Sequence, residues 1–171
     1  LGSTQVISSD KTGTLTLNEM TIEKVFYNNE IHEADEDIDL ELPLLKAITY
    51  ANDSNVDSQG KITGDPTETA MIQYALDKDY PLKENLSTQP RVGEVPFDSA
   101  RKLMSTIHKL DDGRYVVAVK GAPDQLLQRT DQIILNGEVQ SLDDKMKQDI
   151  LDKNNEMARQ ALRALAGADK Y

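Results

Sequence analysis

Short runs of apolar and β-branched residues alternate with turn-forming residues along much of the chain, a pattern typical of strands joined in hairpins. Asn28-Asn29, Asp111-Asp112-Gly113 and Asn136-Gly137 are such turns, because asparagine and glycine tolerate the left-handed backbone of tight hairpins. The strands predicted around these turns and elsewhere lie at residues 3–8, 20–27, 30–32, 92–96, 104–110, 115–120, 132–135 and 138–140.

Apolar residues at helical spacing predict helices between these strands. One begins at residues 64–67 (Gly-Asp-Pro-Thr), a helix-start signal, and places Ala70, Met71, Tyr74 and Ala75 on one face. The predicted helices cover residues 42–51, 64–80, 123–129 and 142–165, the last long and amphipathic. Hairpins interrupted by helices predict an α+β fold, an antiparallel sheet flanked by helices.

Length and composition narrow the classes of protein to consider. The 171 residues suffice for one domain, or for one domain and a fragment of another. We expect Leu1 and Tyr171 to be cut points in a longer protein. The chain has no cysteine, and its two histidines, His32 and His108, lie far apart, so a zinc site is not expected. No apolar run reaches the roughly 18 residues of a membrane-spanning helix.

The chain is acidic, with 30 acidic and 19 basic side chains and a formal net charge of −11. Such a surface repels phosphate backbones, so no nucleic-acid partner is expected. A local basic pocket could still bind a small phosphorylated ligand. The acidic stretch at residues 32–41 is either a solvated loop, which we favour, or an acidic binding segment.

The most specific motif is residues 10–16, Asp-Lys-Thr-Gly-Thr-Leu-Thr, predicted as a loop after the first strand. An aspartate at the carboxyl edge of a sheet is well placed to attack a phosphoryl group. Gly13 allows a tight turn, and Thr12 and Thr14 can contact phosphate oxygens. Phosphatases with an aspartate nucleophile usually carry a second aspartate where this chain has Thr12. Its absence predicts a long-lived aspartyl-phosphate.

This motif resembles the phosphorylation signature of the P-type ATPases, and four later segments resemble the same family in the same order. They are residues 64–70 (GDPTETA), 96–105 (PFDSARKLMS), 120–124 (KGAPD) and 161–166 (ALRALA, where the family usually has glycine at the first position). The calcium-pump branch is the most similar. The resemblance implies a fragment of the phosphorylation domain at residues 1–20 and a nucleotide-binding domain at residues 21–171.

The resemblance also implies the residues of the site. Phe97 would stack on adenine, Glu68 would accept a hydrogen bond from its amino group, and Lys120 would lie at the base of the pocket. Without the resemblance, Phe97 could be a core residue and Glu68 an ordinary first-turn glutamate. The implied nucleotide-binding residues are Glu68, Phe97, Lys102, Met104, Lys120, Gly121, Ala122 and Arg163. The implied catalytic residues are Asp10, Lys11 and Thr12, with Asp10 and Thr12 beside the metal.

Within this set, Gly121 and Ala122 would let the backbone approach the adenine ring. Lys102 and Arg163 would be the cations on the phosphate side, and arginine suits bidentate contact. One position departs from the family, because some animal calcium pumps have an arginine where this chain has Ser99. This chain therefore lacks one phosphate contact that those pumps can make.

The activity implied is that of a cation pump, with calcium favoured by the family branch. ATP would be carried to Asp10, which attacks the γ-phosphate with the help of Mg²⁺. We expect this fragment to be monomeric, to bind ATP weakly and not to pump alone. Its partners would be the phosphorylation, actuator and transmembrane domains of the whole protein, and its setting the cytoplasmic side of a bacterial plasma membrane.

Two other functions are weighed against this one. A small aspartate-dependent phosphatase needs a second aspartate near Thr12 and a complete Rossmann-like core, and the sequence has neither. A non-enzymatic interaction domain would use the acidic stretch at residues 32–41. Such a domain has no reason to bind adenine, so ATP binding separates the two.

Overall fold

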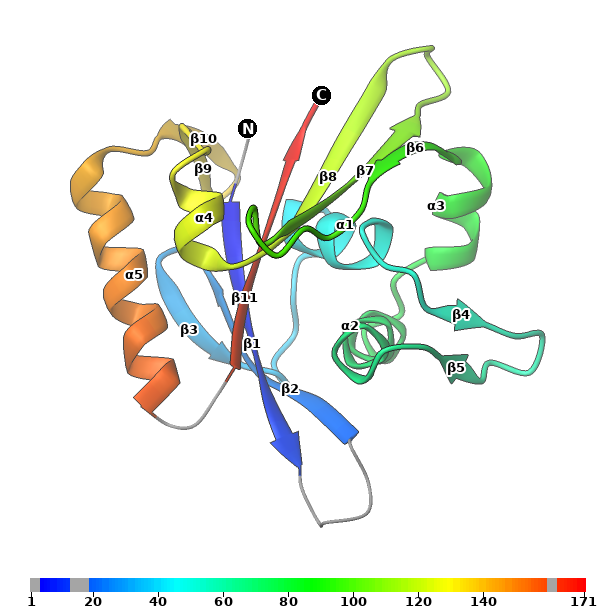
Figure 1. Cartoon of the computed structure of the whole chain (residues 1–171), viewed down its shortest axis with the longest axis horizontal. Helices are drawn as coiled ribbons and strands as arrows, with labels where there is room; N and C mark the ends of the chain where they lie inside the picture. Colours follow the sequence, from blue (N-terminus) through cyan, green and yellow to red (C-terminus); the bar gives the residue numbers. More distant parts are fainter. Residues whose placement is uncertain (1–3, 13–18, 160–162) are drawn as a thin grey trace.

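The centre of the molecule is a seven-stranded sheet in the order β3-β2-β1-β11-β8-β7-β6, shown in Figure 1. The computed structural model describes residues 4–12, 19–159 and 163–171; of residues 4–12, 19, 157, 158, 163 and 164 it describes the backbone alone. Every neighbouring pair in this sheet is antiparallel. Its strands are β1 (Thr4–Thr12), β2 (Glu19–Tyr27), β3 (Glu30–Glu33), β6 (Arg91–Val95), β7 (Leu103–Lys109), β8 (Tyr115–Gly121) and β11 (Arg163–Lys170).

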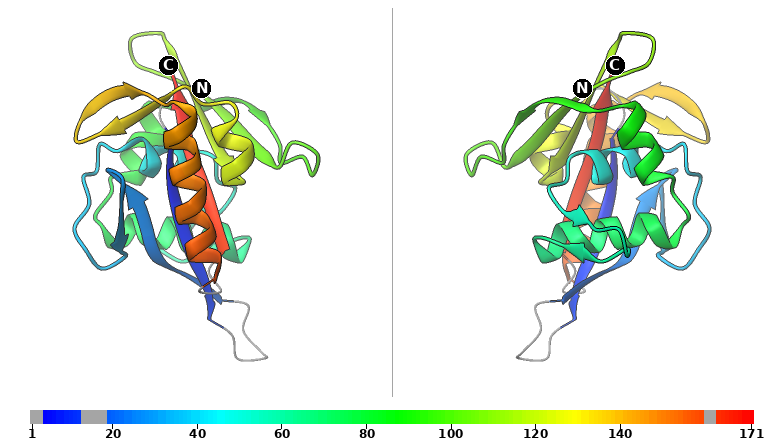
Figure 2. Two further views of the ribbon diagram at one scale, coloured as in Figure 1. Left: turned by 90° about the vertical axis from the view of Figure 1, so that its left-hand side faces the viewer. Right: turned by 90° about the vertical axis from the view of Figure 1, so that its right-hand side faces the viewer.

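Helices cover both faces of this sheet, so the fold has three layers (Figures 1 and 2). One face carries α1 (Pro43–Tyr50), α2 (Pro66–Asp77) and the start of α3 (Leu82–Thr88). The other carries α4 (Pro123–Leu127) and α5 (Asp144–Arg159). Two small hairpins complete the fold, β4 (Asn55–Val56) with β5 (Ile62–Thr63) and β9 (Gln132–Leu135) with β10 (Glu138–Ser141). The predicted α+β class with an antiparallel sheet is confirmed.

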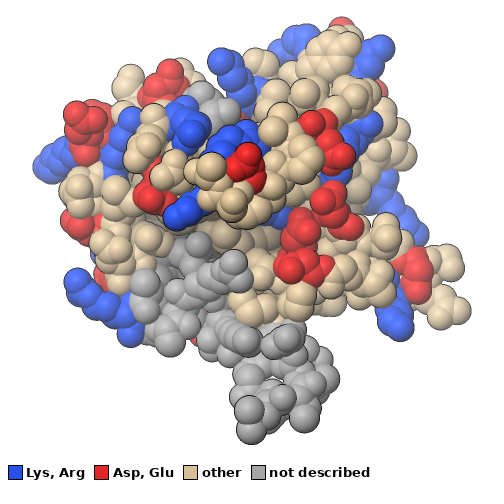
Figure 3. Space-filling model, in the orientation of Figure 1, with Lys and Arg blue, Asp and Glu red and all other residues tan. Residues whose placement is uncertain are grey.

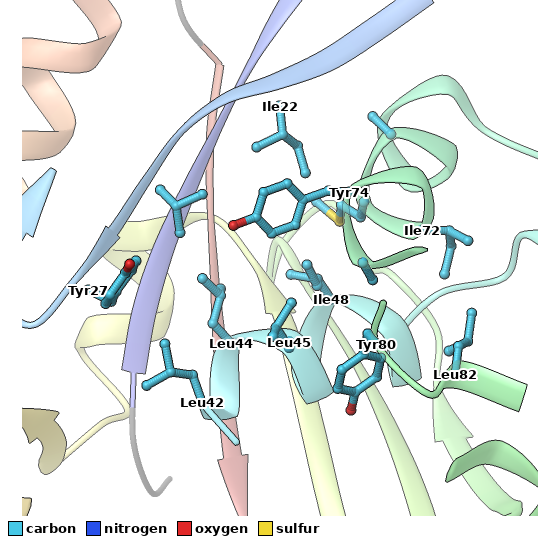
Figure 4. Packing of buried hydrophobic residues seen from close by; sticks show 14 residues of the cluster. Ile22, Tyr27, Leu42, Leu44, Leu45, Ile48, Ile72, Tyr74, Tyr80 and Leu82 are labelled. Carbon is cyan, nitrogen blue, oxygen red and sulfur yellow. The ribbon is translucent and has the colours of Figure 1, made fainter. Parts of the chain in front are cut away.

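The core is divided between the two faces, because successive side chains of a strand point in opposite directions. Val25 of β2 packs in the cluster with α1 and α2, whereas its neighbour Phe26 packs in the cluster with α4 and α5. Figure 4 shows the first cluster, in which α1 residues such as Ile48 lie near Tyr74 of α2. Each such buried side chain contributes roughly 1.5–3 kcal/mol to folding.

The three predicted turns form as expected, and each joins a hairpin. Asn28 and Asn29 have φ of 51° and 61°, and Asn136 and Gly137 have φ of 51° and 83°. Positive φ at both central positions defines the type I′ hairpin turn. Gly113 has φ of 85° in the turn between β7 and β8.

The predicted helix at residues 142–165 is wrong at its C-terminal end. Helix α5 ends at Arg159, and Arg163–Lys170 is strand β11, paired with β1 on one side and β8 on the other. Alanine and leucine favour helix, but this segment lies in the middle of the sheet. Ala166 and Ala168 are buried toward α4 and α5. A side-chain carbon added to Gly167 would lie 2.7 Å from the Cβ of Ala47 in α1.

The first strand is longer than predicted. Strand β1 runs through Asp10 and Lys11 to Thr12, so the backbone is extended where we expected a loop to begin. The reason is the ladder with β2, which continues from Asp10 opposite Thr21 to Thr12 opposite Glu19. The rest of the motif, residues 13–16, lies outside the described residues.

The surface carries both signs of charge despite the net charge of −11. Acidic and basic side chains both occur across the face shown in Figure 3. The acidic side chains of residues 33–41 are exposed, while Ile38 and Leu40 of the same loop pack on the core. Among the described residues, no helix has the length and apolar character needed to cross a membrane.

Candidate functional site

A lysine and a glutamate from distant parts of the chain meet near the C-terminal end of strand β8. The Lys120 Nζ lies 2.7 Å from the Glu68 Oε2, and the two side chains are 8 % and 18 % exposed. Lys120 is near the end of β8, and Glu68 is in the first turn of α2. Removing charges from water is costly unless they are paired. The pairing therefore explains how a lysine can be buried here.

The sequence around the start of α2 fixes where Glu68 lies. The Asp65 side chain caps the helix by accepting hydrogen bonds from the backbone N–H groups of Thr67 and Glu68, and Pro66 occupies the first turn. This is the predicted start signal, because a cap satisfies N–H groups that have no partner within the helix. Gly64 has φ of 148°, and an added side-chain carbon would lie 2.9 Å from the Ser54 Oγ.

Lys120 is placed by the strand ladder. It lies opposite Met104 of β7 on one side and opposite Gly167 of β11 on the other. Both Met104 and Lys120 are buried. Burial lowers the pKa of Lys120, and the Glu68 carboxylate offsets this only in part. A partly enclosed cation with a lowered pKa is typical of functional sites.

Gly121 and Ala122 come directly after Lys120, where β8 meets the start of β7. The Ala122 N–H donates a hydrogen bond to the Lys102 carbonyl oxygen over 3.1 Å. A side-chain carbon on Gly121 would collide with the same carbonyl oxygen and would lie 2.7 Å from the Leu103 Cδ2. The glycine is therefore required for the close approach of the two strands, a reason that differs from the predicted approach to a ring.

Phe97 lies in the loop that connects β6 to β7, and its side chain is 62 % exposed. The alternative interpretation, in which Phe97 is a buried core residue, is therefore wrong. Asp98 forms a tight turn by accepting hydrogen bonds from the N–H groups of Ala100 and Arg101, while its carbonyl accepts from Lys102. Lys102, with φ of 57°, returns the chain to β7 beside Gly121. The turn thus places Phe97 in the loop that leads into the start of β7, where Leu103 lies opposite Gly121 of β8.

Arg101 holds this loop in place. Its guanidinium donates hydrogen bonds to the Leu103 and Val95 carbonyls and to the Ser105 Oγ, at 2.9, 3.4 and 3.3 Å. It therefore joins the end of β6 to the start of β7 on either side of Phe97. The sequence motif contains this arginine, but nothing in the motif distinguishes a loop anchor from a ligand-binding cation.

The structure describes the two predicted phosphate-side cations, Lys102 and Arg163, in different detail. Lys102 is exposed and, within the described ranges, forms no ion pair. Arg163 is known by its backbone, which lies opposite Ser9, the residue before Asp10. Of Asp10, Lys11 and Thr12 the structure likewise describes the backbone alone.

Three residues behind Glu68 were not predicted from the sequence. The Asp53 N–H donates to the Glu68 Oε2 over 3.1 Å, and the Asn52 side chain donates to the Glu68 carbonyl over 2.9 Å. Arg91 of β6 binds Asp53 in turn, at 2.8 Å. Asn52 and Asp53 lie in a polar stretch, and Arg91 is the first residue of β6. Neither position indicates a contact with Glu68 in the sequence, so only the folded structure reveals it.

Comparison with known proteins places the chain in a family. The family model described as P-type ATPase, cytoplasmic domain N, matches residues 43–171. The chain therefore belongs to the P-type ATPases and contains their cytoplasmic domain N.

Similar relatives include calcium-transporting ATPases of bacteria. The chain is 42 % identical over 177 residues to calcium-transporting ATPase 1 of Lactococcus lactis, which covers 99 % of this chain and 20 % of that protein. It is 38 % identical over 171 residues to the calcium-transporting ATPase lmo0841 of Listeria monocytogenes, covering 97 % and 19 %. The sodium/potassium-transporting ATPase subunit alpha-1 of Oreochromis mossambicus is 34 % identical over 169 residues, covering 86 % and 16 %. The chain spans about a fifth of the length of the calcium-transporting relatives.

Proposed function

We propose that this chain is the ATP-binding part of a P-type ATPase that moves a cation across a membrane through an aspartyl-phosphate on Asp10. The observation that carries the proposal is the enclosed pair of Lys120 and Glu68, 2.7 Å apart, near the C-terminal end of β8. The loop that carries the exposed Phe97 returns to the sheet at the start of β7, beside that end of β8. A paired cation and acid together with a free aromatic ring provide what a purine needs, namely stacking and a polar edge contact.

In this pocket Phe97 stacks on the adenine ring, which contributes roughly 1–3 kcal/mol. The Glu68 Oε2 is occupied by Lys120 and by the Asp53 N–H. In the described part of the chain no hydrogen bond is formed by Glu68 Oε1, which can therefore accept from the adenine amino group. Met104, Gly121 and Ala122 form the floor around Lys120. Lys102 and Arg163 lie on the phosphate side.

Asp10 is the proposed acceptor of the phosphoryl group. A carboxylate oxygen of Asp10 attacks the γ-phosphorus, ADP leaves, and the acyl phosphate is later hydrolysed. Lys11 and Thr12 assist from the same strand, and Asp10 and Thr12 are the residues that would hold Mg²⁺, which offsets the phosphate charge when bound. With Thr12 where phosphatases have a second aspartate, hydrolysis of the acyl phosphate is slow.

The proposed cargo is Ca²⁺, because the bacterial relatives are named calcium-transporting ATPases. Transport itself requires the phosphorylation, actuator and transmembrane domains of a full-length protein in a bacterial plasma membrane, so the chain alone would bind ATP as a monomer without pumping. Its own surface would lie on the cytoplasmic side, as the family description states for domain N.

The proposed domain boundary at residue 20 stays a prediction. Residues 21–171 would form the nucleotide-binding domain and residues 1–20 part of the phosphorylation domain. In this chain β1 pairs with β2 and β11, so the proposal requires these pairings to be exchanged in the longer protein. A chain that begins at residue 21 and still binds ATP would support the boundary, and one that fails to fold would contradict it.

Calorimetric titration of the chain with ATP tests the proposed function. Few contacts reach the triphosphate, so we expect a dissociation constant between about 1 μM and 1 mM. Adenosine should compete, because the base supplies most contacts. No heat of binding and no competition would contradict the proposal and favour a non-enzymatic role for the acidic loop at residues 32–41.

A further inference from the structure

Glu68 is held by a network of hydrogen bonds that reaches across to the strand leading into the Phe97 loop. Its first member is the Asp53 N–H, which donates to the Glu68 Oε2 over 3.1 Å. Because Lys120 donates to the same oxygen over 2.7 Å, the two donors together fix the rotation of the carboxylate. The other oxygen, Oε1, is then held in one direction.

Asn52 connects this loop to two helices. Its side-chain nitrogen donates to the Ile48 carbonyl at the end of α1 and to the Glu68 carbonyl in α2, at 3.0 and 2.9 Å, and its side-chain oxygen accepts from the Ser54 N–H at 2.9 Å. Asn52 is 6 % exposed. A buried amide with all these bonds made is a rigid connection.

Arg91 completes the network from β6. Its Nη1 donates to the Asp53 Oδ1 over 2.8 Å, and its Nη2 donates to the Tyr50 and Asn52 carbonyls over 3.0 and 2.8 Å. These carbonyls lie at and just beyond the end of α1, where helix carbonyls lack partners and a cation is favoured. The side chain is 30 % exposed, and the planar fork of an arginine suits several acceptors at once.

We propose that Arg91 is a positioning residue that sets the preference of the site for the 6-amino group of adenine. This inference rests on the proposed function. Arg91 holds Asp53, Asp53 orients the Glu68 carboxylate, and Glu68 contacts the amino group. Strand β6 continues through Val95 into the loop that carries Phe97. The same arginine therefore also fixes the position of the Phe97 loop relative to the start of α2, which carries Glu68.

The test compares the binding of ATP with that of purine riboside triphosphate, which lacks only the amino group. In the Arg91→Gln chain, ATP binding should weaken about three- to tenfold, as expected for loss of an oriented hydrogen bond, and purine riboside triphosphate binding should stay unchanged. Arg114→Gln is the matched control, because Arg114 is an exposed arginine paired with Asp112 in the β7–β8 turn. It should change neither affinity.

A double-mutant cycle shows whether Arg91 acts through Glu68. In a Glu68→Ala chain, which has no side-chain acceptor for the amino group, adding Arg91→Gln should cause no further loss of ATP affinity. An equal loss in both backgrounds, or an equal loss for the two nucleotides, would overturn the inference. Asp53→Asn removes the carboxylate that Arg91 binds but keeps the N–H. It should also weaken ATP binding relative to purine riboside triphosphate binding, and it replaces Arg91→Gln as the test variant if Arg91→Gln does not fold.

A measurement without nucleotide separates this inference from the proposed function. Hydrogen exchange at the Asp53 amide should become faster in Arg91→Gln and in Glu68→Ala, and should stay unchanged in Arg114→Gln. If the Asp53 amide exchanges faster in these two variants while ATP does not bind, the network exists and the proposed function is wrong. If exchange is unchanged in Arg91→Gln, the positioning role is wrong whether or not ATP binds.

Discussion

Lys120 and Glu68 are 52 residues apart in the chain, yet their Nζ and Oε2 atoms lie 2.7 Å apart beneath the surface. Strand β8 supplies one and the first turn of α2 the other. Removing either partner of an enclosed pair leaves an unpaired charge that is costly to bury. The pair is therefore both a structural contact and the polar side of the proposed pocket.

Phe97→Ala is expected to weaken ATP binding by roughly 1–3 kcal/mol, the value of one aromatic ring stacked on a base. Titration calorimetry measures this loss. Tyr115→Ala is a matched control, because Tyr115 is another exposed aromatic residue, at the opposite end of β8 from Lys120. Asp10→Asn should also leave ATP affinity intact. Equal losses in Phe97→Ala and Asp10→Asn would place the pocket elsewhere.

The pH dependence of ATP binding should report on Lys120. Burial lowers the pKa of this lysine, so its charge is lost at a lower pH than that of an exposed lysine. ATP affinity should therefore decrease as the pH rises through this lowered pKa. Lys120→Arg keeps its charge over the same range, and its ATP affinity should stay level. Parallel curves for both chains would show that Lys120 does not contact the ligand.

Gly121→Ala should destabilise the fold, because the added carbon collides with the Lys102 carbonyl oxygen. Overpacking of this kind costs about 1–3 kcal/mol, and more where backbone must move. Gly93→Ala is the control in β6, since the atom nearest to its added carbon would be the Cδ1 of the Ile107 side chain, at 3.3 Å, and not backbone. Urea unfolding compares the two. If Gly121→Ala were as stable as Gly93→Ala, the close approach of Gly121 to the Lys102 carbonyl would be contradicted.

Stability should decrease in acid through His108. This buried ring bonds to the Gln89 carbonyl and the Thr106 hydroxyl, each at 2.9 Å. Burial lowers the pKa of His108, and the positive charges of Arg91 and Lys46 act in the same direction.

Below about pH 6.5 the unfolded chain therefore binds a proton at His108 that the folded chain does not. The free energy of unfolding should decrease as the pH falls from that value to the lowered pKa, by about 1.4 kcal/mol for each unit of lowering. Urea unfolding of the parent chain and His108→Gln at several pH values measures the difference. Identical slopes in the two chains would contradict the assignment.

The hairpins could be predicted from the sequence because their chemistry is local. Asn28-Asn29 and Asn136-Gly137 adopt the positive φ values that few other residue pairs accept. The start of α2 was predictable for the same reason, since Asp65 and Pro66 act within one turn. The α+β class followed from these elements.

Other features depend on contacts between distant segments. Arg163–Lys170 is rich in helix-forming residues, and only its place between β1 and β8 makes it a strand. The resemblance indicated Glu68 and Lys120 as site residues, and the fold brings them into contact. Arg91 and Asn52 carried no signal, because an arginine in a strand and an asparagine in a polar loop are usually solvated.

The most direct test of the central claim is an NMR titration of the chain with ATP, following backbone amide shifts. We expect shifts around Phe97, Glu68 and Lys120–Ala122, with the acidic loop at residues 32–41 unchanged. Shifts confined to that acidic loop, or no shifts at millimolar ATP, would contradict the claim that these residues form an adenine pocket.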